Sequence, residues 1–591
     1  MNPKAKIQQA LDFCQLGQFT RAEQVCREIV SSRPNNTDAL HILGLVALET
    51  QNFTRAAELL SRVVKIDPRY ATAFVNRGSA FQALGQWQAA LESYAQALAL
   101  DANLAEAHYN CGVVLQKLQR SEEALASYDT AIGLRPDLAD VYFNRALVLH
   151  ELNRLPAALA SYDQALMLEP GLAAAALGRA NALYELGRLD EALAAYDRTI
   201  SLTPDDAQAH CNRGNVLREL HQLIAALASY ERAIALRSDL AVAHCNRANV
   251  LSELNQWDLA LAGYDQAIAL NPDYPEAHFN KAMTQLLIED FENGWVNYEW
   301  RLKLKRTPTQ NITEEVRFRE KRWNGKDSLA GKRILIRSEQ GYGDTIQFCR
   351  YVAVLAGLGA EVMLEVQRPL LELLQPLQGA AQVLEPGKPV EFDYQIPLLS
   401  LPLAFGTTLA TIPSATSYLA SDPAKVVAWK SKLGPGLRPR VGLVWRGKVQ
   451  RGDNRSAELT ELAACLPVGF QFVCLQKEIP KPDAGVLATH EIMDCSAELH
   501  NFSDTAALCD CMDIVISIDT SIAHLSAALG KRTWILLPTY PDWRWSRSGA
   551  DCPWYPTARL YRQSSSNAWG EVYARVFADI ASAFGTSGSQ P

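Results

Sequence analysis

Residues 241–274 read AVAHCNRANVLSELNQWDLALAGYDQAIALNPDY, and the 34 residues before them read AQAHCNRGNVLRELHQLIAALASYERAIALRSDL. Small, aromatic and charged residues follow the same order in both, and the period of 34 continues upstream. A fixed period of this length is typical of stacked helix–turn–helix units, in which each unit buries its apolar face against its neighbour. The stretch therefore predicts an α-solenoid for the first half of the chain.

Three positions of the period carry the pattern: a small residue, an aromatic residue four places later, and a proline between units. The small residues are Ala56, Ala90, Ala124, Ala158, Ala192, Ala226 and Ala260; the aromatics are Tyr94, Tyr128, Tyr162, Tyr196, Tyr230 and Tyr264; the prolines are Pro34, Pro68, Pro136, Pro170, Pro204 and Pro272. Glycines at positions 44, 78, 112 and 214 mark places where two helices must approach closely. This pattern resembles the tetratricopeptide (TPR) repeat and covers residues 3–306 as eight units and a ninth.

The ninth unit departs from the pattern in its second helix. Gly294 replaces the alanine, and Trp295 and Trp300 appear. We expect this unit to be a cap that docks onto the next domain. A TPR superhelix has no chemistry of its own and presents a long concave groove for an extended partner.

An asparagine recurs in the first helix of most units: Asn76, Asn110, Asn144, Asn212, Asn246 and Asn280. In O-linked N-acetylglucosamine transferases, a similar ladder on the concave TPR face grips peptide backbone, and the resemblance implies the same role here. An amide suits it, because it both donates and accepts hydrogen bonds. The alternative is that these asparagines brace neighbouring repeats.

A second ladder is basic and has a fixed relation to an acidic one. Arg145, Arg179, Arg213, Arg247 and Lys281 each follow an acid by sixteen residues: Asp129, Asp163, Asp197, Glu231 and Asp265. This spacing predicts ion pairs that join the second helix of one unit to the first helix of the next.

After a polar linker at 307–330, short apolar strands alternate with helical stretches. This order predicts two Rossmann-like lobes with parallel sheets, at 331–430 and 438–585. In open α/β sheets, ligands bind beyond the carboxyl ends of the strands, so two facing lobes make one cleft.

Four stretches at predicted strand ends carry the chemistry, and one of them is the basic loop WRGKVQRGDNRS (445–456). The other three are QGYGDTIQF (340–348), DTSIAHLSAALGK (519–531) and PDWRW (541–545). Together they resemble the carboxyl-terminal domain of bacterial TPR-fused proteins related to glycosyltransferase family 9, the heptosyltransferases, over about residues 320–565. The resemblance implies a GT-B fold, with a nucleotide-sugar lobe at 438–585 and an acceptor lobe at 331–430. The order of repeat array and catalytic half also resembles that of O-linked N-acetylglucosamine transferase.

The donor diphosphate is expected in the second lobe. Asp519, Thr520, Ser521 and His524 lie where a helix begins directly after a strand, and a helix N-terminus favours phosphate. The resemblance implies that these four contact the donor, with Asp519 on sugar hydroxyls or capping the helix. The cations that would face the diphosphate are Arg446, Lys448, Arg451 and Arg455. The alternatives are a solvated basic turn, and a core or capping role for His524.

Asp344 is the expected general base, as the resemblance implies, and it could also cap its helix. At a helix N-terminus we expect it to stay ionised more readily than a free aspartate. Gly341 and Gly343 resemble a phosphate loop, but Ile346 takes the place of the third glycine. We therefore expect the glycines to bring backbone close and to leave Asp344 uncovered. Trp543 and Trp545 could stack on a ligand or pack in the lobe interface.

Composition limits the remaining classes of function. The formal net charge of −8 argues against a general nucleic-acid binder. The N-terminus lacks the apolar core of a signal peptide, and no run approaches the roughly 18 apolar residues of a membrane helix. We expect a cytoplasmic protein without cofactor or metal, whose co-substrate is a nucleotide sugar. Two functions remain open: a glycosyltransferase, or a TPR scaffold whose GT-B-like domain is inactive.

Overall fold

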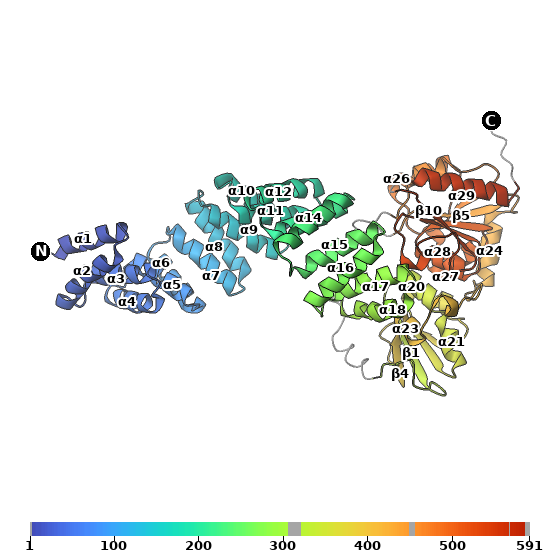
Figure 1. Cartoon of the computed structure of the whole chain (residues 1–591), viewed down its shortest axis with the longest axis horizontal. Helices are drawn as coiled ribbons and strands as arrows, with labels where there is room; N and C mark the ends of the chain where they lie inside the picture. Colours follow the sequence, from blue (N-terminus) through green and yellow to red (C-terminus); the bar gives the residue numbers. More distant parts are fainter. Residues whose placement is uncertain (1–2, 305–320, 448–454, 566–567, 586–591) are drawn as a thin grey trace. The chain divides into compact units, whose positions relative to one another are not determined.

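The computed structural model describes residues 3–304, 321–447, 455–565 and 568–585 (Figure 1). The chain divides into two compact units, Met1–Ser238 and Asp239–Pro591. The first is an α-solenoid of paired helices, and the second joins the last helices of the repeat array to two parallel sheets. The fold class expected from the sequence, an α-solenoid followed by α/β, is confirmed.

The helices of the first compact unit alternate between 13 and 14 residues. They are α1 (Pro3–Gln15), α2 (Phe19–Ser32), α3 (Thr37–Glu49), α4 (Phe53–Ile66), α5 (Ala71–Ala83), α6 (Trp87–Leu100), α7 (Ala105–Lys117), α8 (Ser121–Leu134), α9 (Ala139–Glu151), α10 (Leu155–Leu168), α11 (Ala173–Glu185), α12 (Leu189–Leu202), α13 (Ala207–Glu219) and α14 (Leu223–Leu236). In the second unit the array continues as α15 (Ala241–Glu253), α16 (Trp257–Leu270), α17 (Pro275–Leu287), α18 (Phe291–Tyr298) and the 3-10 helix η1 (Glu299–Lys303).

The small and aromatic positions of the period meet in the core. A Cβ added to Gly78 would lie 2.7 Å from Tyr94 Cδ1, and one added to Gly214 would lie 2.6 Å from Tyr230 Cε1. Both tyrosines are fully buried. The two helices of a unit therefore need glycine or alanine at this position, as the sequence indicated.

The turn between the two helices of each unit repeats one backbone conformation. Its φ is positive at residues 17, 51, 85, 119, 153, 187, 221, 255 and 289, although only three of these nine are glycines. The left-handed conformation strains a residue with a Cβ. The tertiary packing of the repeats therefore imposes the turn even on Gln119 and Glu289.

The first sheet has the strand order β3-β2-β1-β4, and its paired strands run parallel. The strands are β1 (Arg333–Arg337), β2 (Glu361–Glu365), β3 (Ala380–Leu384) and β4 (Tyr394–Pro397). The expected helix after β1 forms as two segments, α20 (Tyr342–Phe348) and α21 (Tyr351–Gly357). Arg350 interrupts it, and the Arg350 Nε donates to the Gln347 carbonyl over 2.7 Å. The connections that follow are η2 (Arg368–Leu370), α22 (Leu371–Leu374), η3 (Leu398–Ser400), α23 (Leu401–Ala404) and η4 (Leu409–Thr411).

The second sheet has the order β10-β9-β8-β5-β6-β7 and is also parallel. Its strands are β5 (Arg440–Val444), β6 (Gln471–Cys474), β7 (Met493–Asp494), β8 (Ile514–Ile518), β9 (Thr533–Leu537) and β10 (Ala558–Arg562). Its other elements are α24 (Pro423–Leu433), α25 (Leu459–Ala463), α26 (Lys481–Thr489), η5 (Ser496–Glu498), α27 (Phe502–Asp510), α28 (Ser521–Ala528), η6 (Trp543–Trp545) and α29 (Trp569–Ala583). Strands β7 and β10 were not predicted from the sequence.

Within the second compact unit, the last repeat packs against the lobe that contains the first sheet, and α18 lies beside α23 (Figure 1). The Trp295 indole N–H donates to the Thr407 carbonyl over 2.9 Å, and the ring is 2% exposed. Arg301 of η1 is buried and pairs with Glu339, which follows β1. These contacts agree with the expected role of the ninth unit as a cap.

Candidate functional site

The order in which the parallel strands are added to the second sheet reverses between β5 and β8, which are neighbours although β6 and β7 separate them in sequence. Such a switch point opens a crevice at the carboxyl ends of the two strands, where ligands of doubly wound folds bind. The chain leaves β5 at Arg446 and Gly447, and leaves β8 at Asp519 and Thr520. The fold therefore brings two of the predicted donor-binding segments together.

Helix α28 starts in this crevice. Thr520 is its N-cap residue, but the Thr520 hydroxyl bonds with Ser517 Oγ over 3.1 Å, and no side chain of the described residues caps the first turn. The first N–H groups of α28, beginning at Ser521, are therefore available to an anion. A Cβ added to Gly447 would lie 3.8 Å from Thr520 Cγ2, so the loop after β5 reaches this helix start.

The loop after β5 brings cations to the same place. Gln476 Oε1 accepts from the backbone N–H groups of Trp445 and Arg446, both over 2.7 Å, and thereby fixes the start of the loop. The Arg446 Nε is buried and has no hydrogen-bond partner among the described residues. Arg455 Nη1 lies 3.6 Å from Asp519 Oδ2. Lys448 and Arg451, the other two predicted cations, lie outside the described residues.

Asp519 is buried beside this cluster and does not cap α28, whose N-cap is Thr520. The capping alternative for Asp519 is therefore wrong. Burial and, to a smaller extent, the Asp542 charge raise the pKa of Asp519, Arg455 opposes both, and together these effects bring it to about 6. A carboxyl with this pKa can accept and donate hydrogen bonds near neutral pH.

His524 lies one turn into α28 and is packed in the interior. Its Nδ1 is 2.9 Å from Tyr555 Oη, and its ring stacks on Trp545 with centroids 4.7 Å apart. Burial holds the pKa of His524 well below its usual value, and Arg544 and Arg350 lower it further. His524 is therefore a neutral residue of the core, as the alternative interpretation of this histidine stated.

Asp344 is in the first turn of α20, and both of its carboxylate oxygens are engaged. Oδ2 accepts from the Gly341 N–H over 2.8 Å, and Oδ1 lies 2.5 Å from Arg544 Nη2. Asp344 is the third residue of α20, whose N-cap is Gly341, so the foreseen N-cap position is wrong, although the carboxylate does bond at the helix start. The expectation of an uncovered carboxylate is wrong, because the Arg544 side chain covers it.

The pKa of Asp344 also differs from expectation. Burial raises it above the ordinary value, and this effect outweighs the lowering by Arg544 and by the Gly341 N–H; Asp542 and Glu339 raise it too. The expectation that a helix N-terminus would keep Asp344 more readily ionised is therefore wrong. It considered the helix end and omitted desolvation.

Gly343 allows α20 to pack on α28. A Cβ at this position would lie 2.8 Å from His524 Cδ2 and 3.5 Å from Ser521 Cα. Gly341 precedes α20 with φ −72°, and a Cβ there would lie 3.3 Å from Asp344 Oδ2. The glycines bring backbone close, as expected, and the second of them joins the first turns of two helices that belong to different lobes.

Trp543 and Trp545 are both buried, at 3% and 0% exposure. The Trp543 ring packs edge-on against Trp295, with centroids 5.3 Å apart, and also contacts Trp554. Trp545 stacks on His524. Both tryptophan rings therefore pack in the interior, as the alternative to ligand stacking stated. Arg544 between them was foreseen from the sequence only as an added charge, since nothing in the motif indicates that its partner is Asp344.

The ion-pair ladder of the repeats is confirmed for the pairs within one compact unit. Nitrogen–oxygen distances are 2.6 Å for Arg145–Asp129, Arg179–Asp163 and Arg213–Asp197, and 2.5 Å for Lys281–Asp265. Arg145 and Arg213 also donate to Ser161 and Ser229 of their own units. Arg247 and Glu231 lie in different compact units.

The asparagine ladder takes part in bonds between repeats. Asn76 bonds with His41, Asn144 donates to Tyr109, Asn212 to Asn181, and Asn280 to Asn249, over 2.8 to 3.1 Å. Each bond uses the amide nitrogen and reaches the preceding unit, as the bracing alternative requires. Asn110 and Asn246 are half-buried like the others. Backbone recognition by this ladder stays a prediction.

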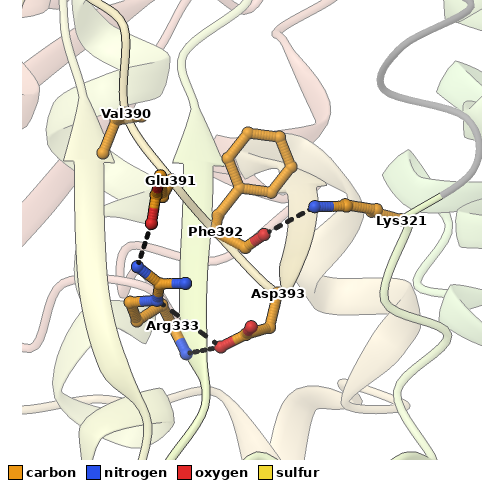
Figure 2. Close-up of a pocket in the computed structure, with 6 residues that line it drawn as sticks. All are labelled: Lys321, Arg333, Val390, Glu391, Phe392 and Asp393. Carbon is orange, nitrogen blue, oxygen red and sulfur yellow. Dashed lines mark hydrogen bonds and ion pairs between the residues drawn. The ribbon is translucent and has the colours of Figure 1, made fainter.

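A separate cavity of about 320 Å³ lies where β1 and β4 begin, at the opposite end of the first sheet from Asp344 (Figure 2). Figure 2 shows that Arg333 contacts Glu391 and Asp393, and that Lys321 donates to the Phe392 backbone carbonyl. Arg333 and the two carboxylates therefore compensate one another's charges.

Comparison with known proteins shows which kind of repeat the first half of the chain contains. Models of the tetratricopeptide repeat match residues 7–71, 78–119, 117–153, 139–171, 180–220, 214–255 and 248–286. The chain therefore carries tetratricopeptide repeats, which are protein-interaction modules.

Individual proteins are similar to parts of the chain. Protein FlbA of Caulobacter vibrioides is 30% identical over 318 residues, which are 48% of this chain and 51% of FlbA. The chain thus spans about half the length of this curated relative. The solved structure of YrrB, a TPR protein with an unusual peptide-binding site, is 25% identical, has a TM-score of 0.30, and covers 32% of this chain and 97% of its own. That of Pseudomonas aeruginosa pilF is 25% identical, with a TM-score of 0.31, and covers 35% and 94%.

Among the described residues, no helix combines the length and apolar character that crossing a membrane requires. Within the same residues, no three His, Cys, Asp or Glu side chains gather as a set that could hold a metal ion.

Proposed function

We propose that this chain is a cytoplasmic glycosyltransferase that moves a sugar from a nucleotide-diphosphate sugar to a hydroxyl group of a polypeptide or glycan. The observation that carries the proposal is the meeting of the Arg446–Gly447 loop with the start of α28 at the switch point between β5 and β8, where Arg455 contacts Asp519. An uncapped helix N-terminus next to a basic loop suits a diphosphate.

In the proposed transfer, the bond between the anomeric carbon and the diphosphate oxygen breaks, and the acceptor oxygen forms a bond to that carbon. The diphosphate leaves with the electron pair, and Arg446, Arg455 and the first N–H groups of α28 stabilise its charge. Asp344 takes the proton of the acceptor hydroxyl. Asp519, with a pKa of about 6, hydrogen-bonds the sugar hydroxyls.

The repeat array would recruit the acceptor in its groove. Asn76 and Asn280 use their amide nitrogens between repeats, which leaves their carboxamide oxygens to accept from a bound chain, whereas the Asn212 oxygen already accepts from Gln208. An extended polypeptide suits such a groove, because its backbone offers N–H donors at regular intervals.

A thermal-shift screen with UDP-, GDP- and ADP-sugars tests the donor site, followed by calorimetry on the best donor. We expect Arg455→Ala to weaken binding about tenfold or more, because it removes a charged contact to the diphosphate. Arg438→Ala is the matched control, since Arg438 is exposed and precedes β5 at the opposite end of the strand. Absence of binding to all three donors by the folded protein would contradict the proposal.

One observation favours a second candidate, a TPR scaffold whose GT-B-like half binds nucleotide sugar without transfer. Both carboxylate oxygens of Asp344 are already engaged, by Arg544 and by the Gly341 N–H. Incubation of the best donor with peptide and glycan acceptor libraries separates the candidates. Labelled sugar in an acceptor supports transfer, whereas tight binding with an intact donor supports the scaffold.

A further inference from the structure

The Arg544 guanidinium lies between two carboxylates that come from different loops. Nη1 contacts Asp542 Oδ1 and Oδ2 over 2.9 and 3.1 Å, and Nη2 lies 2.5 Å from Asp344 Oδ1. Asp542 also caps η6 by accepting from the Arg544 N–H over 3.0 Å. Asp542 therefore fixes both the backbone and the side chain of Arg544, and directs the free edge of the guanidinium at Asp344.

The pair is shielded from solvent. The Arg544 side chain is 9% exposed and that of Asp344 17%. The Arg544 guanidinium carbon lies 4.4 Å from the centre of the Trp543 ring, which limits the guanidinium to one plane. This buried pair is costly to break by removing Arg544, because Asp344 then loses the cation that compensates its charge.

The last two repeats hold the loop that carries Arg544. Trp543 packs against Trp295 and Tyr298, with centroids 5.3 and 6.2 Å away, and the Tyr540 hydroxyl bonds with Ser252 Oγ over 2.9 Å. The position of Arg544 is therefore set by the repeat array and by the second lobe, while its partner Asp344 belongs to the first lobe.

We infer that Arg544 is the positioning residue for Asp344, and that Asp542 orients Arg544 for this role. The inference rests on the proposed function, in which Asp344 takes the acceptor proton. Arg544 holds the carboxylate in one rotamer and favours its ionised form, which is the form that can accept a proton.

The charged and titratable groups near Asp344 come from every element around it. Arg544 and Asp542 belong to the η6 loop, Glu339 follows β1, His524 belongs to α28, and Tyr298 and Arg301 end the repeat array. Glu339 is compensated by Arg301, and the His524 ring is neutral. Arg544 is thus the cation that offsets the raised pKa of Asp344, and its removal should raise that pKa further.

A double-mutant cycle tests the contact without reference to activity. Asp344→Asn, Arg544→Gln and the double variant are unfolded in urea and followed by tryptophan fluorescence. Of the 12 tryptophans, all but Trp87 lie in Asp239–Pro591, so the signal follows this unit. We expect the unfolding equilibrium constant of the double variant to differ about tenfold or more from the value that independent effects of the two substitutions would give, as for contacting charges. Additive effects would overturn the inference.

Kinetics with the best donor test the positioning role. Arg544→Gln should lower kcat about tenfold or more, leave the donor KM within about threefold, and move the acidic limb of kcat/KM to higher pH. Arg544→Lys, which keeps the charge, should restore part of kcat and the original limb. Arg547→Gln is the matched control, because Arg547 is exposed in the same loop and packs on Trp257.

The outcomes separate the two claims. If the wild type transfers sugar but the acidic limb of kcat/KM stays at the same pH in Arg544→Gln, the positioning role is overturned. The proposed function then still stands. No transfer by the wild type from any nucleotide sugar overturns both.

Discussion

The Arg301 guanidinium, from the end of the repeat array, forms a two-point ion pair with the Glu339 carboxylate at the carboxyl end of β1. Nε–Oε2 and Nη2–Oε1 measure 3.0 and 2.7 Å. Arg301 is 1% exposed and also contacts Glu299 and Ser400. Ser400 belongs to η3, which follows β4, and β4 is the neighbour of β1 in the first sheet. The switch point of the first sheet is therefore occupied by a side chain of the last repeat unit.

Breaking this pair should destabilise the second unit strongly. Arg301→Met removes from the buried Glu339 carboxylate the cation that it meets at two points, while Glu299 keeps Arg322, and we expect a loss of about 3–5 kcal/mol in the free energy of unfolding. Lys303→Met is the control, because the Lys303–Asp273 pair is exposed and should contribute less than about 1 kcal/mol. Urea unfolding followed by tryptophan fluorescence measures both. Equal losses in the two variants would show that the buried pair has no special weight.

Gly343→Ala should separate the first turns of α20 and α28. The added Cβ would lie 2.8 Å from His524 Cδ2, and His524 is held by Tyr555 and Trp545. We expect a loss of about 1–3 kcal/mol from overpacking. Gly341→Ala, with its Cβ 3.3 Å from Asp344 Oδ2, should cost less. The comparison needs only thermal unfolding, and a more stable Gly343→Ala variant would show that this helix contact is loose.

Glu289→Gly should stabilise the repeat array. Glu289 is exposed and has φ +70° in the turn between α17 and α18, a conformation that costs a residue with a Cβ about 1–2 kcal/mol. Part of this gain is lost to the backbone entropy of glycine, so we expect a net gain of about 0.5–1 kcal/mol. Asn255→Gly, at φ +59°, should gain less because asparagine tolerates this region. A loss of stability in Glu289→Gly would contradict the assigned strain.

Asp519 should make the stability of the second unit depend on pH. Its folded pKa, about 6, lies above the ordinary value of 3.8, so the native state binds the proton more tightly than the unfolded state. Its contribution is fully present below the ordinary pKa and is lost as pH rises through about 6. Relative to Asp519→Asn, the wild type should lose about 2 kcal/mol between about pH 4.5 and 7.5. Denaturant unfolding across this range measures the difference, and parallel curves for the two proteins would refute the raised pKa.

The periodic half of the fold could be predicted residue by residue. The spacing of sixteen placed Arg145 opposite Asp129, because the stacking of identical units repeats one geometry. Local pattern also placed β1, β5, β8 and β9. Strand β7 was missed because two residues carry too little pattern. In the candidate site, the sequence brought Thr520 to a helix start after a strand, but it misjudged the environment of Asp344, since burial depends on residues far away in the chain.

The sequence by itself determined the repeat array, its ion-pair ladder and the alternation of strands and helices, because these follow from local spacing and from contacts between adjacent units. Only the tertiary structure decided that Arg544 covers Asp344, that His524 is enclosed with Trp545, and that Arg301 fills the switch point of the first sheet. These contacts join residues 200, 21 and 38 positions apart without periodicity. Their physical basis is the compensation and desolvation of buried charge, which depends on the whole surrounding fold.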